Sequence, residues 1–172
     1  MTIQIKYIDG GIGVEIIGSG VVTGADIIAA NKEIYRNENF YRQRYQIVDR
    51  TKCTKYEVSH KEIIIVAEQD KVAAKTNPNI IIAFISTSPL QYGISRMYQA
   101  YVGDEGFLTE VFRDRKSAEK WIKEQLKKQL KILFEYKAMI LNSANFRKSY
   151  KFISSKRLPL TLLSLYAQKT VQ

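Results

Sequence analysis

The chain has 172 residues, of which 45% are apolar and 26% are charged, so it can bury a core of ordinary size. Its single cysteine, Cys53, excludes an internal disulfide and predicts a reducing compartment. The sequence has no run of about 18 apolar residues, the length that a membrane-spanning helix needs, and its N-terminal pattern is typical of a strand rather than a secretory leader. We therefore expect a cytoplasmic protein.

Hydrophobic periodicity and turn signals predict alternating strands and helices along the first two thirds of the chain. The predicted strands cover residues 3–8, 13–22, 45–49, 80–85 and 109–113, and the predicted helices begin at caps Thr23, Ser59, Ser88 and Ser117. In the third helix, the expected core-facing side chains are Leu90, Ile94, Met97 and Tyr101. The glycines of the second strand, Gly18 and Gly20, predict a bulge or a close approach of another backbone. This order predicts an α/β fold with a mostly parallel sheet and one antiparallel strand at its edge.

The net charge of +10 is unevenly distributed along the chain. Residues 1–113 contain 13 basic and 13 acidic side chains, whereas residues 114–172 contain 14 basic and 4 acidic side chains. A neutral body with a basic end predicts an acidic partner for that end, which is an anionic membrane surface, an acidic protein or, less favoured, nucleic acid. A solvated, lysine-rich helix face explains the same pattern without a partner.

The last predicted helix continues beyond the domain. Apolar residues from Ile122 to Leu133 recur at helical spacing, with lysines on the opposing side. The candidate surface for an anionic partner consists of Lys120, Lys123, Lys127, Lys131, Arg147, Lys148 and Lys151. We expect residues 125–172 to form a basic amphipathic helical extension. Its apolar stripe is expected to dimerise, to pack on the body of the protein, or to lie on a membrane surface.

The best candidate for a ligand or partner site lies where the predicted strand 80–85 meets the next helix. Hydroxyl groups and free N–H groups at that helix start can hold an anion. Asp49 ends another predicted strand, and ligands collect at the carboxyl ends of strands in such sheets. The candidate site residues are Asp49, Ser86, Thr87, Ser88, Tyr92 and Arg96. Each also has a purely structural interpretation as a helix cap or as a loop hydrogen bond.

No catalytic group of residues is recognisable, so we do not expect an enzyme. With one histidine, His60, and one cysteine, Cys53, the chain cannot supply a zinc site of His and Cys ligands. The glycines at positions 10–13 lie in a predicted hairpin rather than between a strand and a helix, which excludes a dinucleotide cradle. Asp70 is expected to face water or to bond a neighbouring lysine. We expect no metal and no cofactor.

Three stretches, together with the order of elements, carry a family resemblance. They are residues 92–99 (Tyr-Gly-Ile-Ser-Arg-Met-Tyr-Gln), the strand ending at Asp49, and residues 111–122. Over residues 1–124 they resemble the SpoIIAA-like family of small bacterial proteins, which is related to STAS domains. The resemblance implies a mixed, mostly parallel sheet of about five strands with packed helices. Residues 125–172 are not covered by it.

The resemblance implies two roles. Better-known members of the family bind partner proteins, such as anti-sigma factors, which predicts a non-enzymatic protein-interaction or regulatory module. Part of the group is compared with lipid-carrier domains of the CRAL-TRIO type, which predicts lipid or membrane-surface binding through an apolar pocket, the basic helices or both. The family's phosphorylatable serine is not matched, because Arg50-Thr51-Lys52-Cys53 follows Asp49. The phosphorylation switch is therefore not expected.

Overall fold

The computed structural model describes residues 2–142, and the chain divides into two units, residues 1–123 and 124–172. The strands are β1 (Ile3–Ile8), β2 (Gly13–Thr23), β3 (Tyr45–Glu57), β4 (Ile81–Ile85) and β5 (Leu108–Phe112). The helices are α1 (Gly24–Arg36), α2 (His60–Thr76), α3 (Pro89–Val102) and α4 (Arg115–Asn142). Short 3-10 turns occupy Asp9–Gly11, Phe40–Arg42 and Gly103–Glu105.

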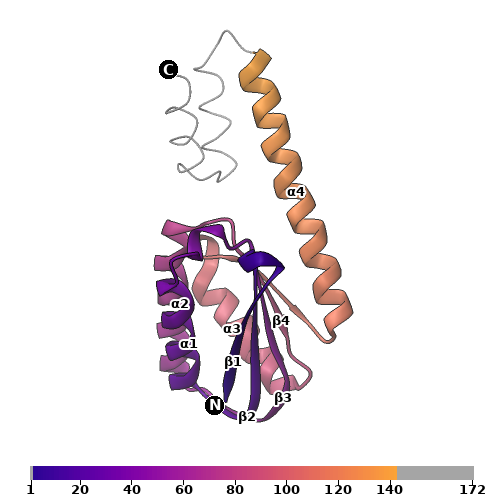
Figure 1. Ribbon diagram of the computed structural model, residues 1–172. Coiled ribbons are helices and arrows are strands. Elements are labelled where there is room, and N and C mark those ends of the chain that lie inside the picture. Colours follow the sequence, from indigo (N-terminus) through magenta and orange to yellow (C-terminus); the bar gives the residue numbers. More distant parts are fainter. Residues whose placement is uncertain (1, 143–172) are drawn as a thin grey trace. The chain divides into compact units, whose positions relative to one another are not determined.

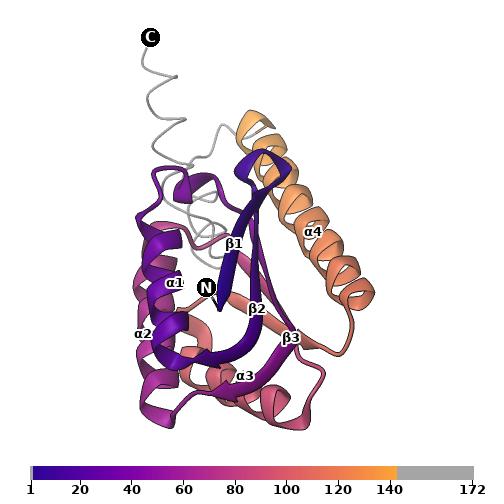
Figure 2. The same cartoon turned by 60° about the horizontal axis from the view of Figure 1, so that its bottom comes forward.

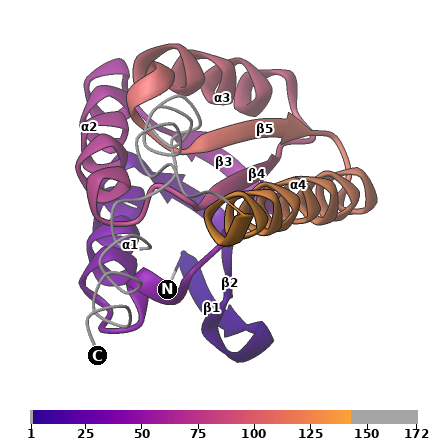
Figure 3. The ribbon, with the colours of Figure 1, turned by 90° about the horizontal axis from the view of Figure 1, so that it is seen from above.

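The strands form one five-stranded sheet in the order β1-β2-β3-β4-β5 (Figure 1). Strand β1 is antiparallel to β2, and the other neighbours are parallel. The predicted α/β fold with a mostly parallel sheet is therefore confirmed. Each crossover moves one strand in the same direction, so right-handed connections place α1, α2 and α3 on one face of the sheet, as Figure 3 shows.

The opposite face of the sheet carries the first turns of α4, which belong to the first unit. Ala118 and Ile122 are buried there, and the rings of Phe112 and Trp121 lie 5.6 Å apart. Strand β4, the predicted central apolar strand, is buried at all five positions. A sheet covered on both faces explains why this strand has a continuous apolar run instead of alternation.

Strand β3 is longer than the sequence predicts. The predicted strand ends at Asp49, whereas β3 continues to Glu57. Its pairing with β4 ends at Asp49, opposite Ile85, and beyond that point its partner is β2. Figure 2 shows the ends of β2 and β3 curving toward α1 and α2. Two register shifts interrupt the β2–β3 pairing, and Gly20, with a φ of 64°, lies at one of them, which confirms the predicted bulge.

Serine and threonine caps begin the first three helices, as predicted. Thr23 and Ser59 each form a reciprocal capping box, and the Ser88 hydroxyl accepts a hydrogen bond at the start of α3. Helix α4 begins differently. The Asp114 carboxylate accepts hydrogen bonds of 2.8 Å from both the N–H and the hydroxyl of Ser117. The cap of α4 is thus Asp114, and the prediction of Ser117 is wrong by three residues.

The core-facing side of helix α3 is only partly the one expected. Leu90, expected to be buried, is 61% exposed, whereas Ile94, Met97 and Tyr101 are half-buried and pack against the core. The buried positions are Gln91, Ser95, Tyr98 and Val102, one residue further along the chain. Two of these side chains are polar, and in the interior they require hydrogen-bond partners.

Candidate ligand-binding site

A partly enclosed pocket of about 60 Å³ lies between the sheet and helices α1–α3. Its walls are mostly apolar side chains from β1 to β4 and from all three helices. The side chains with polar or titratable groups that line it are Asn31, Tyr35, Gln46, Arg50, Cys53, Tyr56, Asp70 and Tyr98. An apolar pocket with a few fixed polar groups is the usual form of a small-molecule site.

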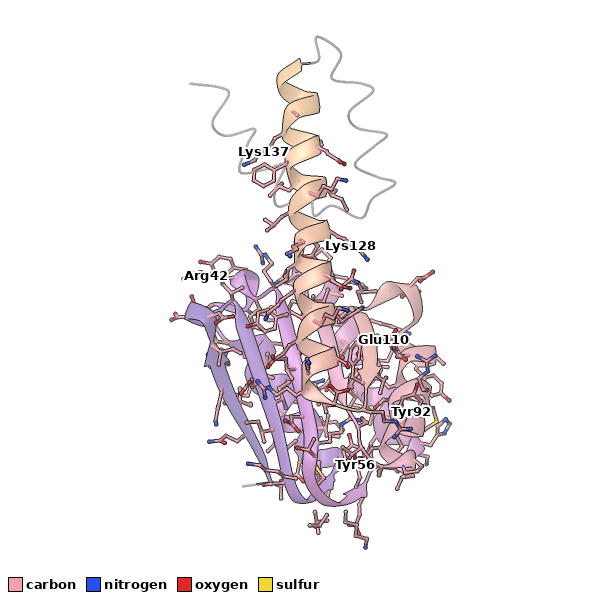
Figure 4. All side chains as sticks on the ribbon, turned by 90° about the vertical axis from the view of Figure 1, so that its right-hand side faces the viewer. Arg42, Tyr56, Tyr92, Glu110, Lys128 and Lys137 are labelled. Atoms are coloured by element: carbon pink, nitrogen blue, oxygen red, sulfur yellow. The ribbon has the colours of Figure 1, made fainter. Side chains whose placement is uncertain are left out.

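Strand alternation places Arg50 in this pocket. Side chains of β3 alternate between the two faces of the sheet, and Gln46, Val48 and Arg50 face the helices. The Arg50 side chain emerges just beyond the point at which pairing with β4 ends. Tyr56, which also lines the pocket, lies near the C-terminal end of β3, at the opposite end of the sheet from Arg42 (Figure 4).

The Arg50 guanidinium is buried against two aromatic rings. Arg50 is 7% exposed, and its Cζ lies 4.8 Å from the ring centroids of both Tyr56 and Phe84. Its Nη1 donates a hydrogen bond of 2.6 Å to Ser95 Oγ. Aromatic faces stabilise a cation, and the hydroxyl contact fixes its position. A guanidinium carries five N–H donors, so these contacts leave hydrogen-bonding capacity for another group.

No carboxylate of the described residues forms an ion pair with Arg50. Asp70 is the one acidic residue among those that line the pocket, and its oxygens are bound to other groups. A buried charge that lacks an opposite charge is destabilising, because its hydration is lost without full compensation. Arg50 therefore gives the pocket a fixed positive charge that an anion can neutralise.

Asp70 lies in α2 and is 3% exposed. Its carboxylate accepts hydrogen bonds from Asn31 Nδ2 at 2.9 Å, from the Tyr35 hydroxyl at 2.5 Å, and from the Tyr98 hydroxyl. Burial raises the pKa of Asp70 from 3.8 to about 6, and the hydrogen bonds from the two tyrosines oppose this rise. The expectation that Asp70 faces water or a lysine is wrong. The residue shares the core-facing side of α2 with Ile63, at helical spacing, so the sequence contained a signal for its burial.

The predicted turn before α3 divides between two roles. Ser86 is fully buried, and its Oγ lies 3.3 Å from Ser95 Oγ, so it joins the hydrogen bonds around Arg50. Ser88 acts as the helix cap, with its Oγ accepting from the N–H of Gln91 at 3.2 Å. The backbone carbonyls of Ser86, Thr87 and Ser88 accept hydrogen bonds from Arg113 Nη1 at 3.2, 3.0 and 3.3 Å. The carbonyls of this turn thus bind a cationic side chain of the protein itself.

None of the six candidate residues is among those that line the pocket, and the other three lie in separate contacts. The Tyr92 ring, which Figure 4 labels, stacks under Arg113, with Cζ 4.2 Å from its centroid. Arg96 is exposed and pairs with Glu110 at 3.4 Å. Asp49 points to the opposite face of the sheet and lies 3.8 Å from Arg115. Because Asp49 is within β3 rather than at its end, its expected place at a strand terminus is wrong.

The candidate basic surface is only partly within the described residues. Lys120, Lys123, Lys127 and Lys131 are exposed on α4, and Lys131 lies 3.8 Å from Glu135. Figure 4 also labels Lys128 and Lys137 on this helix. Arg147, Lys148 and Lys151 lie outside the described residues.

The single cysteine and the single histidine have different surroundings. Burial raises the pKa of the Cys53 thiol, an effect that the positive charge of Arg50 opposes. The ring of His60 contacts the hydroxyl of Tyr101 and does not line the pocket. Within residues 2–142, no group of three or more His, Cys, Asp or Glu side chains is placed to hold a metal ion.

Comparison with known proteins found no matching family model, no matching curated protein and no matching solved structure. Among the helices that the structure describes, none is both long enough and apolar enough to cross a membrane.

Proposed function

We propose that this protein is a non-enzymatic binding protein whose pocket between the sheet and α1–α3 holds a small, largely apolar ligand. The observation that carries the proposal is the pocket itself, with apolar walls, a buried arginine and a buried aspartate. This role corresponds to the apolar-pocket alternative that the sequence leaves open.

The pocket is an empty space within the protein interior. Protein interiors are normally packed without voids much larger than a water molecule. A closed, empty cavity of about 60 Å³ would lower stability by about 1.4 kcal/mol at roughly 24 cal/mol per Å³, and the partial opening of this pocket reduces that cost. Larger side chains at the small residues of the wall, such as Ala30, would remove this penalty. Binding of a ligand in the pocket explains why the pocket has not been filled by larger side chains.

The test uses a variant that fills the pocket. Ala30 lines it from α1 and is 7% exposed, so Ala30→Leu places additional carbon atoms in the cavity. Ala25→Leu, at an exposed position of the same helix, is the matched control. The full chain is titrated with 1-hexanol and with sodium hexanoate, and binding is followed by NMR shifts of backbone amides.

We expect at least one of the two probes to shift the amides of pocket residues in the wild-type protein and in Ala25→Leu. In Ala30→Leu we expect affinity to fall at least tenfold. The proposal is overturned if neither probe shifts those amides, or if Ala30→Leu binds as tightly as the wild type does.

A second candidate is the protein-interaction module that the SpoIIAA-like resemblance implies. The observation that favours it is the exposure of two large apolar side chains of α4, Leu130 at 54% and Phe134 at 65%. Exposed apolar side chains at helical spacing are typical of a contact with another protein or a second copy. Sedimentation of the full chain and of a Leu130→Ser, Phe134→Ser variant tests this role. Monomeric masses for both proteins would count against self-association.

A further inference from the structure

We propose that the ligand is an apolar monocarboxylate and that its carboxylate binds the guanidinium of Arg50. This inference rests on the proposed function and names the chemical class of its ligand. The alkyl part of the ligand would lie along the apolar wall between the sheet and the helices.

The Arg50 side chain is held in a fixed position by its neighbours. Two aromatic rings, at 4.8 Å each, and the Ser95 hydroxyl, at 2.6 Å, position the guanidinium at the pocket wall. A planar guanidinium with a fixed orientation presents paired N–H donors that match the two oxygens of a carboxylate. Because its position is set before binding, little side-chain entropy is lost when the anion arrives.

The second argument concerns the direction of the hydrogen bonds around Ser95. Its hydroxyl donates to the backbone carbonyl of Gln91 at 2.8 Å and accepts from Arg50. The proton of the 3.3 Å contact between the two serine hydroxyls is therefore supplied by Ser86. Ser95 has no further proton for a ligand, so it is a positioning residue, and the anion is bound through Arg50.

The third argument is charge. Arg50 is the one basic residue and Asp70 the one acidic residue among those that line the pocket. A carboxylate carries one negative charge, which Arg50 balances. A phosphate monoester carries about −1.5 to −2 at neutral pH, and its second charge would find no cation among the residues that line the pocket. The pocket therefore favours a singly charged head group.

The fourth argument is size. A cavity of roughly 150 Å³ binds benzene in an engineered protein core, whereas this pocket is about 60 Å³. A flexible, unbranched alkyl chain can place a few of its carbon atoms in this narrow space while the rest of the chain lies in the opening of the partly enclosed pocket. We therefore choose the six-carbon acid, hexanoate, as the probe.

The experiment compares head groups on one chain length. The full-length wild-type protein at pH 7 is titrated calorimetrically with hexanoate, 1-hexanol, hexylamine and hexyl phosphate. The variants are Arg50→Met, which keeps the volume and removes the charge, and the matched control Arg96→Met at an exposed arginine. We expect wild type and Arg96→Met to bind hexanoate at least tenfold more tightly than 1-hexanol, and Arg50→Met to bind the two about equally.

Each other outcome contradicts a defined part of the account. Equal affinities of the wild type for hexanoate and 1-hexanol would overturn the assignment of Arg50, and this comparison does not depend on whether a variant folds. Tighter binding of hexyl phosphate than of hexanoate would overturn the monocarboxylate class. Tight binding of 1-hexanol alone would leave the proposed function standing without this inference, whereas no binding of any probe would remove both.

Discussion

Two arginines on opposite faces of the sheet have contrasting surroundings. Arg115, at the start of α4, has a side chain that is 43% exposed, yet it pairs with Glu15, with Glu119 at 2.7 Å and with Asp49 at 3.8 Å. Arg50, on the helix-covered face, is 7% exposed and contacts two rings and a hydroxyl. The more exposed cation has three acids, and the buried one has none among the described residues.

The expected distribution is the reverse, because solvent can balance an exposed charge and a buried charge needs a partner. The contacts of Arg115 tie α4 to β2 and β3 and are complete within the protein. Those of Arg50 are incomplete. We infer that Arg115 has a structural role and that the charge of Arg50 is kept for a ligand.

The largest expected effect concerns Asp70, the acid on the same face as Arg50. Its pKa is about 6 in the folded protein and 3.8 in the reference state, so the folded state holds the proton more tightly. Stability contributed by this group is therefore present at low pH and is lost as the pH rises from about 4 to 7, by about 2 kcal/mol. Urea unfolding of wild type and Asp70→Asn across this range gives the difference between them.

The other carboxylates titrate alike in both proteins, so their effect cancels in the difference between the free energies of unfolding of wild type and Asp70→Asn. The elements packed against Asp70 contribute hydrogen-bonding, titratable or charged side chains, and none of these changes in the variant. They are Asn31 and Tyr35 of α1, Tyr98 of α3 and Arg50 of β3. A difference that stays constant with pH, or that grows in favour of the wild type as pH rises, would show that Asp70 is not protonated by burial.

The next effect is the stability of Arg50→Met without ligand. Arg50 is a buried charge with no acidic partner in residues 2–142. Replacing it by an apolar side chain of similar length removes a desolvation penalty, so we expect the free energy of unfolding to rise by about 1 to 2 kcal/mol. Denaturant unfolding of the unliganded protein measures it. If the ring contacts of Arg50 have a purely structural role, the free energy of unfolding of Arg50→Met should fall instead.

Arg115→Met is the matched substitution on the other face, and we expect it to lower stability by about 1 kcal/mol. Glu15 and Asp49, with side chains 12% and 15% exposed, would lose their cation, although the exposure of Arg115 itself limits the effect. Unfolding in 0.1 M and 1 M NaCl checks this, since salt should reduce the loss. An increase in stability would mean that the two arginines do not differ as proposed.

The smallest effect is expected for Arg96, which the sequence suggested as a site residue. Its side chain is 54% exposed and its ion pair with Glu110 is at the surface, so Arg96→Ala should change stability by less than about 0.5 kcal/mol. Hexanoate affinity should be unchanged. A loss of affinity of tenfold or more, measured by calorimetry, would return Arg96 to the site.

Much of the fold follows from local patterns, and the site does not. Capping serines, a continuous apolar run and turn glycines predicted the order of the elements, because each of these signals acts within a few residues of the chain. The second half of β3 was missed because its register shifts break the two-residue alternation. Arg50 lies in that half of β3, so the sequence did not predict it as a site residue.

Two buried polar side chains of α3 illustrate the same limit. Gln91 and Ser95 are not among the core residues that the sequence predicts, yet both are buried because Ser95 bonds the Arg50 side chain and Gln91 Nε2 lies 3.4 Å from the Arg50 carbonyl. These partners are more than 40 residues away in the chain. Helical spacing alone could have indicated the burial of Asp70, but not its tyrosine partners on two other helices.

The central claim is that the positive charge of Arg50 is available for an anionic ligand. The most direct measurement is the free energy of unfolding of wild type and Arg50→Met, each with and without sodium hexanoate. At about ten times the dissociation constant, binding should stabilise the wild type by about 1.4 kcal/mol. We predict this response in the wild type and almost none in Arg50→Met, which should be the more stable protein without ligand. An equal response in both, or a less stable Arg50→Met, would contradict the account.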